Sequence, residues 1–399
     1  MAAKKKLMIL GASYSQLPLI AAAKRMGVTA LVASIPGDYP GFAEADETVF
    51  VDISDERAVL EAAKSAKIDG IATCCMDIGT RALGYVCETM GLPGMSILAA
   101  EASCNKYLEK QAYLRSGVNT ARFFRVQSEE ELETALGKLK FPVMVKAVDL
   151  MGSRGIFRSD SREEALENYR KTTEATQKNY CIVEEFLEGE MFGVEAMVSK
   201  GELAYFLMLG NEMLAGNPPF PIGHYVPWEH AGTLYGKVRE QISRAVDALG
   251  FDNCPLDFDC MLMDGEVYII EATGRAGATC IADTVGIYYG IDYFEAIVRV
   301  ALGMDVRELF PEDHVGTPSV TRLLSADEAG VVERIEVPRE LPGNVVDLSF
   351  NIGAGSRVRA MSNGADRIGQ LVVKGQDLGD CYRELETVLG GIHVILKDR

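Results

Sequence analysis

The sequence predicts an α/β protein with an N-terminal parallel-sheet domain, a small lid, a central antiparallel sheet and a C-terminal β-rich subdomain. In the first 100 residues, short apolar runs alternate with helical stretches, a pattern typical of a parallel sheet with helices on its faces. Two long apolar strands later flank the turn Asp264-Gly265, which is a hairpin signal. From about Thr317 onward, short strands and turns dominate until a helix at residues 378–389.

The N-terminal domain is predicted to span residues 1–100. Two of its helices end at Gly27 and Gly91, because glycine readily adopts the left-handed conformation of a helix C-cap. The turn after the first strand begins at Gly11 but lacks the other two glycines of a dinucleotide-binding motif, so an oxidoreductase ranks last among the hypotheses. The predicted strands are residues 7–10, 29–33, 49–51 and 70–73, and the predicted helices are residues 17–26, 56–66 and 79–90.

The second domain is predicted to span residues 101–316, with the lid at about residues 120–185. Within the lid, Ser161 and Glu164 form a capping pair at the start of a helix. The C-terminal subdomain is predicted to span residues 317–399. For the second domain, the predicted strands are residues 141–147, 180–184, 193–198, 203–209, 256–263 and 267–272, and the predicted helices are residues 103–116, 233–249 and 293–302.

Charge and composition narrow the range of functions. The 399-residue chain has 40 Lys and Arg against 58 Asp and Glu, a formal net charge of −18, which argues against binding nucleic acid or an anionic membrane surface. Small molecules are therefore the expected partners. No apolar run approaches membrane-spanning length. The nine cysteines are scattered and lack zinc-ligand spacing, which indicates buried thiols in a reducing cytoplasm.

A pair of carboxylates gives the sharpest local signal. Asp259 and Glu271 lie twelve residues apart on the two strands of the predicted hairpin, where alternation can point both to one face. Adjacent carboxylates repel each other unless a cation lies between them, and hard oxygen ligands suit Mg²⁺ that is also held by nucleotide phosphates. The alternative is an exposed acidic pair on a solvated sheet face. Arg275, four residues beyond Glu271, adds a fork of donors for an anion.

The segment Glu271–Arg275, with the sequence E-A-T-G-R, resembles the E-x-N-x-R signature of the ATP-grasp superfamily, which includes biotin carboxylase, carbamoyl phosphate synthetase and the L-amino acid ligases. The resemblance covers nearly the whole chain and implies the ATP-grasp fold, with nucleotide between the lid and the central sheet. Thr273 stands where the family has a metal-binding asparagine. The resemblance thus implies Asp259, Glu271 and Thr273 as ligands of Mg²⁺, with Mn²⁺ as an alternative ion.

The same resemblance implies a set of phosphate-binding residues. Lys106 on a predicted helix and Lys146 at the end of the apolar strand F-P-V-M-V-K match the two phosphate-binding lysines of the family. A buried ammonium group needs an anion, and a phosphate supplies one. The next segment, D-L-M-G-S-R-G-I, matches the glycine-rich loop that closes over the triphosphate, where glycines can aim N–H groups at anionic oxygen. The expected contacts in this loop are Gly152, Ser153, Arg154 and Gly155.

Residues 182–189, with the sequence I-V-E-E-F-L-E-G, resemble the hinge segment whose backbone reads adenine. An adenine ring needs one donor, one acceptor and two apolar faces. Met191 stands where the family often has a ribose-binding acid, and Glu190 is adjacent to it. The implied contacts with adenine and ribose are Glu184, Phe186, Leu187, Glu190 and Met261.

A proline-rich loop at residues 217–228 carries the only tryptophan of the chain. Its position resembles that of the substrate-recognition loop of amino-acid ligases, which makes His224 and Trp228, together with Arg275, the candidate substrate contacts. A packed loop with no role in binding is the alternative.

The resemblance implies an ADP-forming carboxylate–amine ligase. A substrate carboxylate would take the γ-phosphate of ATP and an amine, such as that of an amino acid, would attack the acyl phosphate, with Lys146, Arg154 and Arg275 as catalytic residues. A bicarbonate-activating carboxylase is the alternative on the same scaffold. Thr273 and Met191 motivate another alternative, a non-catalytic nucleotide-binding protein. Because many relatives form homodimers, a homodimer is a further expectation.

Overall fold

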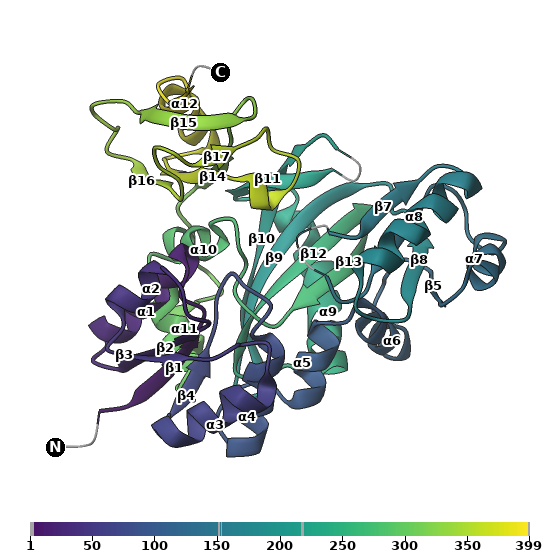
Figure 1. The fold of residues 1–399 in the computed structure, drawn as a ribbon, viewed down its shortest axis with the longest axis horizontal. Helices are drawn as coiled ribbons and strands as arrows, with labels where there is room; N and C mark the ends of the chain where they lie inside the picture. Colours follow the sequence, from purple (N-terminus) through teal and green to yellow (C-terminus); the bar gives the residue numbers. More distant parts are fainter. Residues whose placement is uncertain (1–3, 151, 153, 217–218, 398–399) are drawn as a thin grey trace. The chain divides into compact units, whose positions relative to one another are not determined.

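The computed structural model describes residues 4–150, 152, 154–216 and 219–397, and its elements are labelled in Figure 1. The chain divides into two compact units. Unit 1 comprises Met1–Leu207, Gly232–Ala278 and Asp292–Glu312, and unit 2 comprises Met208–Ala231, Thr279–Ile291 and Asp313–Arg399. The domain boundaries at residues 100 and 316 stay predictions.

Unit 1 begins with a parallel sheet, as the sequence predicts. The strand order is β3-β2-β1-β4, and all three pairings are parallel. Residues 7–10 in the central strand β1 are fully buried. The strands are β1 (Lys6–Leu10), β2 (Thr29–Ser34), β3 (Glu47–Phe50) and β4 (Gly70–Ala72), and the helices are α1 (Leu17–Arg25), α2 (Pro40–Glu44), α3 (Glu56–Ala66), α4 (Thr80–Met90) and α5 (Ile97–Ser103).

A second, antiparallel sheet in unit 1 forms the lid, with the strand order β5-β8-β6-β7. The helices α7 and α8 lie together beside this sheet (Figure 1). The side chain of Ser161 accepts a hydrogen bond from the backbone of Glu164, which confirms the predicted cap of α8. The elements are β5 (Phe123–Val126), α7 (Glu129–Leu136), β6 (Val143–Ala147), β7 (Ile156–Ser159), α8 (Arg162–Ala175) and β8 (Cys181–Glu185).

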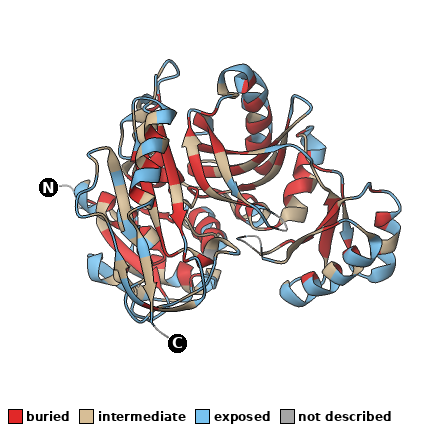
Figure 2. Ribbon diagram, turned by 90° about the horizontal axis from the view of Figure 1, so that it is seen from above, coloured by how far each residue is buried: buried red, intermediate tan, exposed pale blue. Residues whose placement is uncertain are grey.

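The third sheet of unit 1 has the order β13-β12-β9-β10. Asp264 and Gly265 both have positive φ angles, 52° and 75°, and they join β12 to β13 in the predicted hairpin. Buried residues concentrate along the strands, whereas exposed residues lie on the outer sides of the helices (Figure 2). The elements are β9 (Glu190–Ser199), β10 (Glu202–Leu214), α9 (Ala231–Leu249), β12 (Cys254–Met263), β13 (Glu266–Thr273) and α11 (Tyr293–Ala301).

Unit 2 contains the end of β10 and the strands that follow it in the order β11-β14-β18-β16. A core of buried apolar side chains, among them Val320, Leu371 and Leu385, lies between these strands and α12. The elements are β11 (Phe220–Val226), α10 (Ile281–Tyr289), β14 (Ser319–Leu324), β15 (Gly330–Glu336), β16 (Val345–Phe350), β17 (Arg357–Val358), β18 (Gly369–Lys374), α12 (Leu378–Leu389) and β19 (His393–Leu396). Among the described residues, none of the helices combines the length and apolar character needed to cross a membrane.

Two sequence predictions were wrong in detail. The predicted helix at residues 103–116 begins only at Lys106, because Asn105 is extended and its side chain caps α6 (Lys106–Ser116) by accepting hydrogen bonds from the next turn, while Ser103 is the last residue of α5. The predicted loop at residues 217–228 contains the strand β11, while residues 217 and 218 lie outside the described residues. Pro221 fits in this strand because it pairs with Met213 at an irregularity in the register.

Candidate active site

Helix α6 buries charged side chains where an ordinary surface helix would bury apolar ones. Glu109, Lys110 and Tyr113 are each at most 2% exposed. Tyr113 donates a hydrogen bond of 2.5 Å to Glu109 Oε1, and the backbone N–H of Ala272 on β13 donates to the same oxygen. Because burial disfavours the ionised form and Glu271 lies nearby, the pKa of Glu109 rises to about 8. A helix face of this kind is typical of a functional site, since unpaired buried charge is costly.

The hairpin β12–β13 presents a row of carboxylates. Asp259 is paired directly with Glu271, and Asp257 with Thr273, so the four side chains lie on one face of the hairpin. Burial, together with the nearby charges of Glu271 and Asp257, raises the pKa of Asp259 to about 8. Thr273 donates a hydrogen bond of 3.4 Å to the carbonyl of Asp257. The structure therefore brings the three predicted metal ligands together.

Lys106 at the start of α6 is the counter-ion of the hairpin. Its Nζ lies 2.7 Å from Glu271 Oε2 and also donates to the carbonyl of Leu150, at 3.2 Å. Burial would raise the pKa of Glu271, but the positive charges of Lys106, Lys146 and Arg275 together lower it overall. One cation thus contacts both a candidate metal ligand and the start of the glycine-rich loop.

Arg275 is fixed by two carboxylates. Its Nε donates to Asp77 Oδ1 and its Nη1 to Asp257 Oδ2, both at 2.5 Å. The surrounding segment is fixed as well, because Gly274 N donates to Ser103 Oγ at 2.8 Å and Gly277 N donates to Glu195 Oε2 at 3.0 Å. These contacts set the plane of the guanidinium group, so it can present donors to an anion in a defined direction.

Most of these groups line one pocket in unit 1, but Asp257 and Asp259 are not among its lining residues. Residues from the loop after β4, from α6, from the glycine-rich loop and from the hairpin meet there. The lining residues are Asp77, Ser103, Cys104, Asn105, Lys106, Glu109, Val148, Asp149, Leu150, Gly152, Glu271, Ala272, Thr273 and Arg275.

Lys146, the second predicted phosphate ligand, is buried in the lid sheet. Its Nζ lies 2.6 Å from Glu184 Oε1, and Lys110 Nζ lies 2.9 Å from Glu184 Oε2. Burial would raise the pKa of Glu184, but the two lysines lower it overall. The carboxylate of Glu184, predicted to lie near adenine, therefore bridges two lysines.

The glycine-rich loop connects β6 to β7. Gly152 and Gly155 have φ angles of 62° and 65°, a left-handed conformation that glycine adopts without strain. The carbonyl of Gly155 accepts a hydrogen bond from Ala147 N at 2.8 Å, which fixes one end of the loop to β6. Ser153 lies outside the described residues, and Arg154 lies between the two glycines.

The predicted hinge follows β8. Phe186 N donates to the carbonyl of Pro142 at 3.1 Å, so an edge contact from the Phe186 backbone would have to use its carbonyl group. A Cβ atom on Gly189 would lie 2.1 Å from the carbonyl oxygen of Leu262, so the hinge packs directly against β12. On β12, Met261 is paired with Met191 of β9. Leu187, the third predicted hinge contact, comes directly after Phe186 in the chain.

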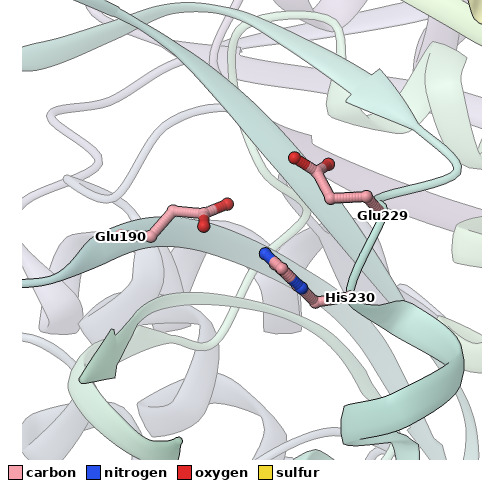
Figure 3. Close-up of side chains that lie close together, drawn as sticks. All are labelled: Glu190, Glu229 and His230. Carbon is pink, nitrogen blue, oxygen red and sulfur yellow. The ribbon is translucent and has the colours of Figure 1, made fainter. Parts of the chain in front are cut away.

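Glu190, the candidate ribose ligand, begins β9 (Figure 3). The same figure shows Glu229 and His230 on the segment between β11 and α9. Glu190 belongs to unit 1, whereas Glu229 and His230 belong to unit 2, and no metal site is assigned to them.

The two candidate substrate residues, His224 and Trp228, lie in unit 2 and are buried there. His224 has hydrogen-bond partners at both ring nitrogens, with Asn211 Oδ1 2.8 Å from Nδ1 and Thr279 Oγ1 2.6 Å from Nε2. Burial lowers the pKa of His224 to about 4. Trp228 packs edge-on against His230. A role for either residue in binding substrate stays a prediction.

Sequence reasoning missed Asp77, Asp257, Glu109 and Lys110. Sequence spacing could have identified two of them. Asp257 lies two residues before Asp259 on the same strand face, and Lys110 lies one helical turn after Lys106. No local sequence pattern points to Asp77, because it lies in a loop and its partner Arg275 is 198 positions away in the chain.

Comparison with known proteins identifies the family. A model for the phosphoribosylglycinamide synthetase ATP-grasp (A) domain matches residues 104–212, and a model for L-amino acid ligase C-terminal domain 2 matches residues 322–397. The crystal structure of phosphoribosylglycinamide synthetase from Anaerococcus prevotii is 35% identical, covers 99% of this chain and 100% of that chain, and has a TM-score of 0.84. The chain belongs to the ATP-grasp family of carboxylate–amine ligases.

Two more distant relatives agree with this ATP-grasp assignment. The L-amino acid ligase of Bacillus licheniformis is 20% identical with full coverage of both chains and a TM-score of 0.86, which confirms the predicted ATP-grasp fold. Alanine–anticapsin ligase of Bacillus subtilis is 24% identical over 275 residues, which cover 62% of the ATP-grasp chain described here and 58% of that relative. The chain thus matches less than two thirds of the length of this curated relative.

Proposed function

We propose that this ATP-grasp protein is an ADP-forming ligase that activates a small carboxylate as an acyl phosphate and couples it to an amine. The observation that carries the proposal is the meeting of Lys106, Glu271 and Arg275 in one pocket. Cations for phosphate, a carboxylate for a metal ion and a fixed guanidinium group are the parts that phosphoryl transfer requires.

The donor set fits Mg²⁺. Asp259 and Glu271 offer oxygen ligands from paired strands, and the raised pKa of Asp259 is expected where carboxylates are packed together without enough positive charge. Thr273 would contribute its hydroxyl group, a weaker ligand than an amide oxygen. Bound at these residues, Mg²⁺ or Mn²⁺ would neutralise charge on the phosphates of ATP.

The nucleotide contacts follow from the positions of the lysines and the hinge. Lys106 and Lys146 would bind phosphate oxygens, and N–H groups beside Gly152 and Gly155 would cover the triphosphate together with Ser153 and Arg154. Adenine would lie against Met261 and the hinge residues Glu184, Phe186 and Leu187, and ribose would contact Glu190.

The proposed reaction needs no protein nucleophile. A carboxylate oxygen of the substrate attacks the γ-phosphorus, the bond to the β-phosphate oxygen breaks and ADP leaves. The amine then attacks the acyl carbon and loses a proton, and the phosphate departs with the former carboxylate oxygen. Lys146 and Arg154 would stabilise charge on the transferred phosphate, and Arg275 would stabilise the tetrahedral oxyanion.

Substrate identity follows from measurement of phosphate release. Amino acids, hydroxy acids, bicarbonate and amines are tested singly and in pairs with ATP and Mg²⁺. We expect release that requires both a carboxylate and an amine. Release that depends on bicarbonate would instead support a carboxylase, and ATP binding without any stimulated release would support a non-catalytic nucleotide-binding protein. The homodimer and the cytoplasmic location stay predictions.

A further inference from the structure

Lys110 is not among the residues that line the pocket, and the one predicted nucleotide contact that it touches is Glu184. It is 1% exposed, and its Nζ lies 2.9 Å from Glu184 Oε2. Glu184 in turn binds Lys146 through its other oxygen, at 2.6 Å. We call Lys110, Glu184 and Lys146 the lysine–glutamate cluster.

The two lysines of the cluster differ in how firmly their side chains are held. Lys110 Nζ also donates to Thr120 Oγ1 at 2.7 Å, and Thr120 donates to the carbonyl of Ile269 on β13 at 2.9 Å. Lys110 is therefore held from two sides, by the lid sheet and by the hairpin. Lys146, at the end of β6, precedes the glycine-rich loop by a few residues.

The charges define what each lysine can do. With two lysines and one carboxylate, the cluster carries 2 − 1 = +1. If Lys146 turned to a phosphate and Glu184 had no other partner, a buried carboxylate would be left uncompensated, at a high cost in free energy. Lys110 removes that cost because it stays with Glu184.

We infer that Lys110 is a positioning residue for nucleotide binding: it keeps Glu184 paired and so leaves Lys146 available to the phosphates of ATP. The inference rests on the proposed function and adds to it a residue that does not itself touch the nucleotide. Lys110 acts through the other two members of the cluster.

Three variants test this inference by changing the charge of the cluster. Lys110→Met gives 1 − 1 = 0, Glu184→Gln gives 2 − 0 = +2, and the double variant gives 1 − 0 = +1, the wild-type value. Isothermal titration calorimetry measures the Kd for ATP with excess Mg²⁺ and the Kd for adenosine. Lys171→Met on the exposed face of α8 is the matched control.

We expect Lys110→Met to raise the Kd for ATP about tenfold or more, because Glu184 then retains Lys146. The Kd for adenosine should change little, since adenosine has no phosphate. The double variant should recover to within about threefold of wild type, because the predicted adenine contact of Glu184 is through its backbone, which Gln retains. Such recovery is the non-additivity expected of residues in contact. If Lys110→Met does not fold, the double variant still tests the inference, because it is expected to fold and to bind ATP.

Three results would overturn the inference: an ATP Kd for Lys110→Met within about twofold of wild type, equal losses for ATP and adenosine, or a double variant that binds as weakly as the single variant or does not fold. If the wild-type protein itself binds no ATP, the proposed function fails and the inference fails with it. Wild-type binding with any of the three results leaves the proposed function intact and rejects the role of Lys110 alone.

Discussion

The Lys106 ammonium group lies 2.7 Å from Glu271 Oε2, so this ion pair connects the proposed phosphate-binding and metal-binding parts of the site. Lys106 is one of the two candidate phosphate-binding lysines, and Glu271 is one of the three candidate metal ligands. The side chains are 12% and 28% exposed, so each needs a counter-charge before nucleotide and metal arrive. Binding of ATP with Mg²⁺ would replace this direct contact by contacts of each residue with the bound phosphates and ion.

Glu271→Gln should lower phosphate release about 100-fold or more, because a neutral amide binds Mg²⁺ weakly and no longer balances Lys106. The measurement is the rate of phosphate release as a function of Mg²⁺ concentration. Glu266→Gln is the control, since Glu266 lies on the same strand but pairs with Lys237 at the surface. Equal losses in both variants would contradict the assignment.

Arg275→Lys should fold less stably and turn over more slowly. A lysine cannot hold Asp77 and Asp257 with the geometry of a guanidinium group, so one partly buried carboxylate loses its partner, at a cost of up to about 3 kcal/mol. Urea unfolding and phosphate release measure the two effects. Arg170→Lys, in an exposed ion pair with Glu129, should change neither, and a fully stable, fully active Arg275→Lys protein would rule out this role.

Gly189→Ala should destabilise the protein by about 1–3 kcal/mol, because its Cβ would lie 2.1 Å from the Leu262 carbonyl oxygen and force the hinge away from β12. Gly236→Ala is the matched change, since its Cβ meets nothing within 4 Å and lies inside α9. That variant should be stabilised by up to about 1 kcal/mol. Urea unfolding compares the two, and destabilisation of both alike would contradict the packing argument.

His224 should make stability depend on pH on the acidic side. Its folded pKa of about 4 lies below the ordinary value of 6.5, so the unfolded chain binds more protons between these values. Its contribution to stability is complete above pH 6.5 and is lost as the pH falls toward 4, by at most about 1.4 kcal/mol per pH unit. Urea unfolding at pH 7, 6 and 5 should show a shallower slope for His224→Gln; identical slopes would show that the buried ring is not responsible.

The sequence predicted the parts of the site that depend on local pattern. Asp259 and Glu271 meet because a hairpin signal and strand alternation together determine which residues face each other. The left-handed conformations of Gly152 and Gly155 are likewise what glycine in such a loop predicts.

The remaining parts depend on tertiary contacts. Helix α6 buries Glu109 and Lys110. Sequence analysis places such charged residues on the surface, because the buried face of a helix is usually apolar. Asp77 meets Arg275 only because the loop after β4 lies against the segment after β13, a contact between distant positions that local pattern does not encode. The strand β11 was missed because the prolines in and around it favour a loop, although Pro221, which lies in the strand, is accommodated at an irregular pairing.

The central claim is that the carboxylate passes through an acyl phosphate. The most direct measurement uses the substrate pair found in the phosphate-release survey, with ¹⁸O in both carboxylate oxygens, and mass spectrometry of the phosphate released. We predict that each phosphate carries one ¹⁸O atom, because it departs with an oxygen of the carboxylate. Phosphate without ¹⁸O, formed at the same rate as product, would contradict the account.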